Sequence, residues 1–357
     1  RATDRGARCM SGCCSAHDKE ATDGGYLVSE FLASLRKVTL HDHLDGALRP
    51  ATIIDLAREQ GYGDLPTTDV DALADWFDQG MPGNSLETYL TTFTHTVALM
   101  QNEDAIRRVT REWVEDVAGE GVDLGEVRVA PELMTSGGLT IERVVDVIAN
   151  ELEESGSRLG VRAGLICCAM RTADRSLAVA RLVADRVGSN VIAFDLAGSE
   201  KGGPALRHKE AIDLVHAAGG KVTLHAGEGD GVDSIRQAVV DCRAHRIGHG
   251  VRIVEDIDFS GSVPRFGEVA QFVHERGIPL EVCPTSNLHT GLYASLGEHP
   301  ISVLDDLGFV VTVNPDNRLM SRTSLTREFA GLMAVHGWDE QRVNRVTAQA
   351  RAVAFLA

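Results

Sequence analysis

Short apolar runs alternate with longer amphipathic stretches along most of the chain, starting at about Val38. The short runs are rich in β-branched residues, which favours strands, while the longer stretches have the spacing of helices that bury one face. The predicted strands are Val38–His41, Glu126–Ala130, Arg162–Ala169, Val191–Asp195, Lys221–His225, Arg246–Gly248, Pro279–Val282 and Val310–Val313. The predicted helices between them include Ala105–Ala118, Ile141–Glu153, Ser176–Arg186, Ala205–Ala218, Val232–Val240 and Gly267–Arg276. Eight strand–helix units of this kind predict an α/β fold, a closed (β/α)8 TIM barrel.

The longest interruption of this alternation runs from Pro50 to about Asn102, and its predicted helices are Ala51–Glu59, Val70–Phe77 and Leu86–Met100. Because it follows the carboxyl end of the first strand, we expect a helical lid over the mouth of the barrel, where active sites of this fold lie. Tyr89, Leu90 and Phe93 share one face of the last helix, and the pattern favours packing against the barrel over contact with a ligand.

The first 25 residues lack hydrophobic periodicity and contain Cys9, Cys13 and Cys14. We expect a disordered tail over residues 1–25, since no second pair of zinc-finger ligands follows, and one catalytic domain over residues 26–357. The tail has no apolar core of the secretory type, and the remaining cysteines stand in apolar contexts that suit a reducing cytoplasm.

Charge narrows the class of partner. The formal net charge is -17, which disfavours binding to nucleic acids or anionic membranes, because those partners are usually met by basic surfaces. A run of apolar residues long enough to cross a bilayer is absent from the sequence. The acidic balance by itself indicates solubility and little more. A small-molecule partner is expected from the candidate chemistry described next, and the sequence leaves the oligomeric state open.

Polar residues cluster where the predicted strands end. His41 and His43 alternate on the first strand, and three later strand ends carry His225, His249 and Asp316. Three histidines and one aspartate make a complete ligand set for one zinc ion, and a further histidine, together with Glu228, then remains to move protons. Since no lysine ends the fourth predicted strand to bridge two ions, a single-metal hydrolase that activates water is predicted.

Each of these residues also has a structural interpretation when taken alone. Glu228 could be a carboxylate at a helix start, and Asp316 could be a turn residue beside Pro315. The metal site is favoured because the same ligand types recur at four strand ends. The residues by themselves do not identify the substrate.

Five segments resemble the adenosine deaminase family, in particular its actinobacterial members, in order from about Val38 to the C-terminus. They are Leu40–Pro50 (LHDHLDGALRP), Asp195–Glu200 (DLAGSE), Thr223–Glu228 (TLHAGE), Arg246–Gly250 (RIGHG) and Asn314–Arg318 (NPDNR). The resemblance implies a zinc-dependent barrel that hydrolyses adenosine, and also 2′-deoxyadenosine, to the inosine product and ammonia in cytoplasmic purine salvage.

The resemblance also implies roles for individual residues. The zinc ligands would be His41, His43, His225 and Asp316. Glu228 would protonate purine N1, which requires a carboxyl group that keeps its proton in a dry pocket.

The remaining implied roles concern water and substrate. His249 would hold and deprotonate the zinc-bound water with help from Asp316. Asp45 would bind a ribose hydroxyl, the Gly198 backbone N–H would reach purine N3, and His43 would border the substrate as well as bind zinc.

The chain departs from the family pattern at Asn317, where a second aspartate is common, and at Pro315. Purine N7 is an acceptor, and an asparagine offers it an N–H without needing to be protonated, so purine binding is expected to survive. The alternatives are a deaminase of adenine, or of an N6-substituted or 5′-modified adenosine, and, more distantly, a nucleoside-binding protein without activity. Asp45 disfavours a 5′-phosphate, because a carboxylate repels it.

Overall fold

The computed structural model describes residues 29–78 and 86–356. Eight parallel strands pair in chain order: β1 (Lys37–His43), β2 (Val122–Val129), β3 (Arg162–Met170), β4 (Val191–Ala197), β5 (Lys221–Ala226), β6 (Arg246–His249), β9 (Leu280–Val282) and β10 (Val311–Val313). The barrel closes between β1 and β10, where the His43 N–H donates to the Asp316 carbonyl oxygen at 2.7 Å and the Asp316 N–H donates to that of His41 at 3.0 Å. The predicted (β/α)8 barrel is confirmed.

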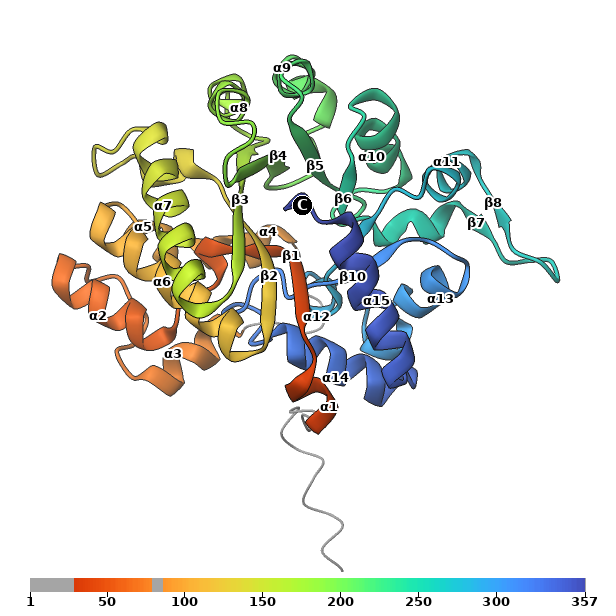
Figure 1. The fold of residues 1–357 in the computed structure, drawn as a ribbon, viewed down its shortest axis with the longest axis horizontal. Coiled ribbons are helices and arrows are strands. Elements are labelled where there is room, and N and C mark those ends of the chain that lie inside the picture. Colours follow the sequence, from red (N-terminus) through yellow and green to blue (C-terminus); the bar gives the residue numbers. More distant parts are fainter. Residues whose placement is uncertain (1–28, 79–85, 357) are drawn as a thin grey trace, which may run out of the picture.

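Helices form a ring outside the strands (Figure 1). They include α6 (Glu103–Gly119), α7 (Ile141–Leu159), α8 (Ser176–Ala184), α9 (Lys209–Ala217), α10 (Val232–Arg236), α11 (Glu268–Arg276), α13 (Ile301–Asp306), α14 (Leu325–His336) and α15 (Glu340–Val353). Local signals set their ends: the Asn102 side chain accepts the Ala105 N–H at 3.0 Å before α6, and Gly160 adopts a left-handed φ of 73° after α7. Within the described residues, no helix is long and apolar enough to cross a membrane.

The sequence pattern was less accurate for the shorter elements. The predicted helix Ala205–Ala218 divides into a 3-10 turn (Ala205–His208) and α9, and the predicted helix Val232–Val240 divides into α10 and a π-helical turn (Gln237–Asp241). A two-stranded hairpin, β7 (Ile257–Asp258) with β8 (Arg265–Phe266), was not predicted, because two-residue strands have no detectable period.

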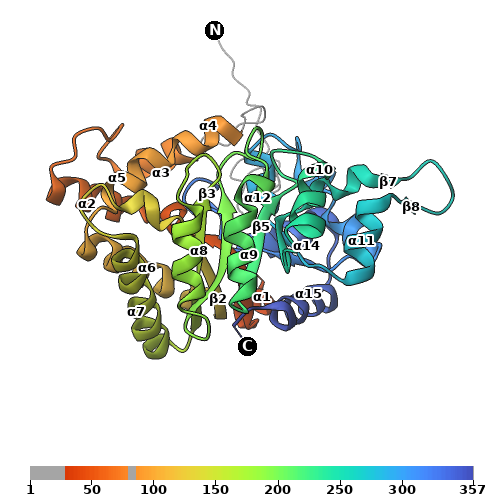
Figure 2. The ribbon, with the colours of Figure 1, turned by 90° about the horizontal axis from the view of Figure 1, so that it is seen from above.

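The insertion after β1 contains α2 (Pro50–Gln60), α3 (Val70–Phe77), α4 (Leu86–Thr91) and α5 (Phe93–Leu99). The prediction of one helix over Leu86–Met100 is wrong, since that segment breaks at Thr92, whose hydroxyl donates to the Tyr89 carbonyl oxygen at 2.7 Å and competes with the helical hydrogen bond. Figure 2 shows α3 and α4 along one end of the barrel, with α1 (Glu30–Ser34) and α15 at the other.

The four cysteines of the domain, Cys167, Cys168, Cys242 and Cys283, are free and buried, as expected for small core residues. Cys9, Cys13 and Cys14, together with the rest of the predicted tail, lie outside the described residues.

Candidate active site

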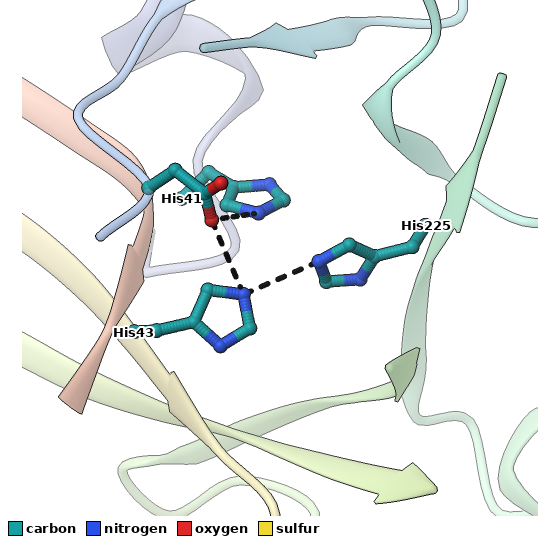
Figure 3. Close-up of side chains that lie close together, drawn as sticks. His41, His43 and His225 are labelled. Atoms are coloured by element: carbon teal, nitrogen blue, oxygen red, sulfur yellow. Dashed lines mark hydrogen bonds and ion pairs between the residues drawn. The ribbon is translucent and has the colours of Figure 1, made fainter. Parts of the chain in front are cut away.

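Four side chains from three parts of the barrel converge at the carboxyl ends of the strands (Figure 3). His41 and His43 project from β1, His225 projects from β5, and Asp316 follows β10. His41 Nε2 and His43 Nε2 lie 3.2 Å and 3.4 Å from Asp316 Oδ1, and the Nε2 atoms of His43 and His225 lie 3.2 Å apart. One potential ligand atom from each of the four residues lies within 4.8 Å of the others.

This cluster fits a divalent cation. His41 Nε2 is buried without a hydrogen-bond partner, and two imidazole nitrogens face each other across the cluster. Three histidine nitrogens and a carboxylate oxygen are a donor set that Zn²⁺ accepts.

Two buried carboxylates orient two of the histidines by contacting their Nδ1 atoms. Glu281 on β9 lies 2.9 Å from His41 Nδ1, and Asp195 on β4 lies 2.9 Å from His225 Nδ1. Arg128 joins them, at 2.8 Å from Asp195 and 2.6 Å from Glu281. Burial opposes ionisation of Glu281, yet Arg128 and Arg246 hold its pKa well below its ordinary value. Both carboxylates therefore stay charged and direct the Nε2 atoms of their histidines into the cluster.

Glu228 and His249 lie beside the cluster, with His249 Nε2 3.5 Å from Glu228 Oε2 and 4.0 Å from Asp316 Oδ2. Burial, and then the charges of Asp316 and Glu200, raise the pKa of Glu228 well above its ordinary value. Burial also lowers the pKa of His249 well below its ordinary value. The pair therefore combines a protonated carboxyl group with a neutral imidazole.

The backbone at two of these positions is unusual. His249 and Asp316 have φ angles of 61° and 62°, in the left-handed region that residues other than glycine seldom adopt. Hydrogen bonds around them support this geometry, including the one that Ser286 Oγ donates to Asp316 Oδ2 at 2.6 Å. Such conformations concentrate at functional sites.

Glu200 holds the loop that carries Glu228. Its carboxylate accepts the backbone N–H groups of Gly227, Glu228 and Gly229 at 2.8–2.9 Å, and the Ser234 hydroxyl at 2.6 Å. Since Glu200 follows β4 and Ser234 lies on α10, one buried carboxylate connects three segments at the barrel mouth.

A cavity of about 260 Å³ opens beside the cluster, lined by His43, His225, Glu228, His249 and Asp316. The three other residues that the sequence suggested for substrate binding, Asp45, Gly198 and Asn317, also line it. Burial raises the pKa of Asp45 to about 7, and Asp45 Oδ1 is buried without a hydrogen-bond partner.

The lid supplies an apolar wall to this cavity. Tyr89, Leu90 and Phe93 all line it, so the ligand-facing interpretation of these residues agrees with the structure better than packing alone. The Tyr89 hydroxyl lies 3.0 Å from Ser321 Oγ, which connects the lid to the loop after β10.

Sequence reasoning did not identify the residues that support the site, namely Glu200, Glu281, Arg128, Ser286 and Asn287. Glu281 carried a usable signal, because it is a charged residue between Leu280 and Val282 in a predicted buried strand. Arg128 carried the same signal, because it lies between Val127 and Val129 in the predicted strand Glu126–Ala130, and Glu200 ends the DLAGSE segment. Ser286 and Asn287 gave no comparable pattern, since their roles depend on partners far away in the sequence.

Comparison with known proteins agrees with this geometry. The family model described as adenosine deaminase matches residues 36–357. The chain is 47% identical over 327 residues to adenosine deaminase 1 of Streptomyces coelicolor, covering 90% of this chain and 82% of that protein. It is 44% identical to an adenosine deaminase of Mycobacteroides abscessus, covering 90% of each chain.

Among solved structures, the crystal structure of an adenine deaminase from Arthrobacter aurescens superposes with a TM-score of 0.80 at 26% identity, covering 89% of this chain and 93% of that one. The family model extends over the whole barrel, and each of the two relatives is identical to this chain at more than two fifths of the aligned positions. The chain belongs to the adenosine deaminase family.

Proposed function

We propose that this protein hydrolyses adenosine, and 2′-deoxyadenosine, to the inosine product and ammonia with one zinc ion per chain. The observation that carries the proposal is the meeting, in one cavity, of a four-residue metal cluster with a carboxyl group whose pKa is raised. The two relatives compared above bear the name adenosine deaminase.

The proposed zinc ligands are His41, His43, His225 and Asp316. A zinc ion held by these residues would supply a water molecule of lowered pKa as the nucleophile. The chain's own contribution is to fix these ligands through Glu281 and Asp195 and to shield the reaction with the apolar lid.

Glu228 is the proposed proton donor to purine N1. Attack at C6 pushes electrons onto N1, and a neutral carboxyl group gives its proton there as charge develops. Such a group is available at neutral pH only when its pKa is raised, which burial achieves for Glu228. His249 Nε2 and Asp316 Oδ2 lie 4.0 Å apart, and one of the two groups would accept the proton of the attacking water.

The substrate contacts follow from the same cavity. Asp45 Oδ1, which has no hydrogen-bond partner, is assigned to a ribose hydroxyl, and the Gly198 N–H is assigned to purine N3. Asn317, which lines the cavity, is assigned to N7, because its amide can donate an N–H to that acceptor without having to be protonated.

The cavity favours a nucleoside over a nucleotide. Among the described residues that line it there is no lysine or arginine, and Asp45 would repel a phosphate. The lid wall of Tyr89, Leu90 and Phe93 gives a bound sugar and base apolar contacts. We place the reaction in the cytoplasm, because the four described cysteines are free thiols.

The experiment is an ultraviolet assay of zinc-loaded protein with adenosine, 2′-deoxyadenosine, adenine and AMP. Conversion of the two nucleosides, abolished by a chelator and restored by zinc, supports the proposal. Turnover of adenine or AMP instead of the nucleosides would support the same mechanism but change the assigned substrate. Bound zinc with no turnover of any 6-aminopurine would contradict the proposal and favour a nucleoside-binding protein.

Glu228→Gln tests the proton donor. It should keep zinc and fold but lower kcat by about 10²–10⁴-fold, the usual contribution of general acid catalysis. A kcat near that of the unmodified protein would refute the assignment of Glu228.

A further inference from the structure

A chain of buried hydrogen bonds ends at His249. The backbone N–H of Ile301 donates to His299 Nδ1 at 3.2 Å, and His299 Nε2 lies 3.2 Å from Asn287 Oδ1. Asn287 Nδ2 then lies 3.1 Å from His249 Nδ1. His249, Asn287 and His299 are each at most 2% exposed, so water is excluded from these contacts.

The chain has a fixed direction because a backbone N–H only donates. His299 Nδ1 must accept from Ile301, so a neutral His299 carries its hydrogen on Nε2 and donates to Asn287 Oδ1. Burial lowers the pKa of His299 to about 3, which keeps this ring neutral. The opposite amide orientation would require His299 to accept at both ring nitrogens, which a neutral imidazole cannot do.

Asn287 therefore turns its NH₂ group to His249, whose Nδ1 accepts. We propose that Asn287 and His299 are positioning residues that hold His249 in the tautomer with hydrogen on Nε2. That nitrogen faces Glu228 Oε2 at 3.5 Å and Asp316 Oδ2 at 4.0 Å, inside the cavity. His249 thus presents a donor to the cavity, whereas the family resemblance implied a base.

This tautomer assigns the protons of the proposed deamination, and this step rests on the proposed function. A lone pair of the water oxygen forms the bond to C6, one water proton passes to the Asp316 carboxylate, and the Glu228 proton passes to N1. His249 donates a hydrogen bond to the attacking oxygen and keeps its own proton. The C6–N6 bond then breaks as the Asp316 proton moves to the leaving amino group, and the hydroxyl proton on C6 returns to Glu228.

The first test is long-range ¹H–¹⁵N NMR of the histidine side chains in the full-length protein, with and without zinc. A ring nitrogen that carries hydrogen resonates far from one with a free lone pair, so the spectrum reports the tautomer without depending on activity. His249 is assigned by the loss of its signals in His249→Gln. Hydrogen on Nε2 is expected, and hydrogen on Nδ1 alone would overturn the proposal.

Variants test the cause. Asn287→Asp replaces the NH₂ donor by an acceptor of the same shape and should bring hydrogen to Nδ1 of His249. His299→Gln keeps an N–H toward Asn287 Oδ1 and should preserve the Nε2 tautomer. Asn190→Asp is the matched control, because the Asn190 amide donates to the Ala149 carbonyl oxygen at the opposite end of the barrel. An unchanged His249 tautomer in Asn287→Asp would remove Asn287 from the proposal.

Kinetic measurements distinguish a positioning role of Asn287 and His299 from a loss of folded protein. Asn287→Asp should lower kcat for adenosine about 100-fold, the scale of losing one donor to a developing oxyanion, with KM little changed. His299→Gln should stay within a few-fold of the unmodified protein. If the Nε2 tautomer is observed but adenosine is not converted, the proposed function fails while the assignment of Asn287 and His299 stands.

Discussion

A substitution at Glu200 can distinguish two effects on Glu228: an effect on the position of its side chain and an effect on its pKa. Each oxygen of the Glu200 carboxylate accepts two hydrogen bonds: Oε1 those of the Glu228 and Gly229 N–H groups, and Oε2 those of the Gly227 N–H and the Ser234 hydroxyl. Glu200→Gln puts an NH₂ group at one of these oxygens.

The less damaging orientation has the NH₂ at Oε2, because the Ser234 hydroxyl can rotate to accept and only the Gly227 N–H loses its partner. An unsatisfied buried donor costs about 1–3 kcal/mol, and the two remaining backbone bonds lose their charged acceptor, so we expect a destabilisation of about 2–4 kcal/mol. Ser234→Ala, which removes one donor and keeps the charge, should cost about 1 kcal/mol. Urea unfolding followed by circular dichroism measures both.

The catalytic consequence has two parts. A shifted loop misplaces Glu228, and kcat/KM for adenosine should fall by about 10–100-fold. The negative charge of Glu200 also helps to raise the pKa of Glu228, after burial and Asp316. The protonated form is present below that pKa and is lost as pH rises through it, so removing the charge should move the alkaline limb of kcat to lower pH.

Ser234→Ala is the control for this shift, since it retains the Glu200 charge and should leave the limb in place. A Glu200→Gln protein with unchanged kcat/KM and an unchanged alkaline limb would refute the reasoning. Lost activity without a shifted limb would restrict Glu200 to positioning.

Two further predictions concern the metal and the lid. Glu281→Gln should weaken zinc binding about 10–100-fold in competition with a chelator, because the partner of His41 Nδ1 loses its charge. The control is Glu151→Gln, which changes a buried carboxyl group on α7. Equal zinc affinities of the two variants would contradict the role of Glu281. Tyr89→Phe removes a hydroxyl that contacts Ser321 and Asn317, and should lower kcat/KM for adenosine about 10-fold, but not for 7-deazaadenosine, which has no N7 acceptor. The control is Tyr62→Phe, which loses a hydroxyl 2.8 Å from His95 Nδ1 in the same insertion and should leave kcat/KM unchanged for both substrates. If Tyr89→Phe lowers kcat/KM equally for both substrates, Asn317 is not involved.

The sequence predicted the barrel and the metal cluster for one physical reason. Parallel strands of a closed barrel end at the same rim, so His43, His225 and Asp316 meet although they are far apart along the chain. Strand alternation then brings His41 to the same centre as His43. Residue type and strand position were sufficient to predict that these side chains meet, whereas the choice of His225 rather than His249 as a proposed ligand came from the family resemblance.

The tautomer of His249 could not be predicted in the same way, although the family resemblance did imply a protonated Glu228. The tautomer of His249 depends on Asn287 and His299, which follow it by 38 and 50 residues and reach it only through tertiary packing. The break at Thr92 is a local event, but a side chain that competes for one carbonyl oxygen leaves the hydrophobic pattern of the helix unchanged. Hydrophobic periodicity therefore predicted the strands that carry the site residues, whereas the tautomer of His249 depends on tertiary contacts that periodicity does not report.

The charges around Glu228 explain why the support of Glu200 is needed. A divalent cation at the cluster favours ionised carboxylates nearby and so lowers the pKa of Glu228, whereas the proposed reaction needs its protonated form. Burial and the charges of Asp316 and Glu200 act in the opposite direction. If Asp316 is a ligand as proposed, a bound ion would largely neutralise its charge, which would leave burial and Glu200 as the influences that keep the proton on Glu228. Glu200→Gln should therefore move the alkaline limb of kcat to lower pH, because it removes one of the two remaining influences that keep Glu228 protonated.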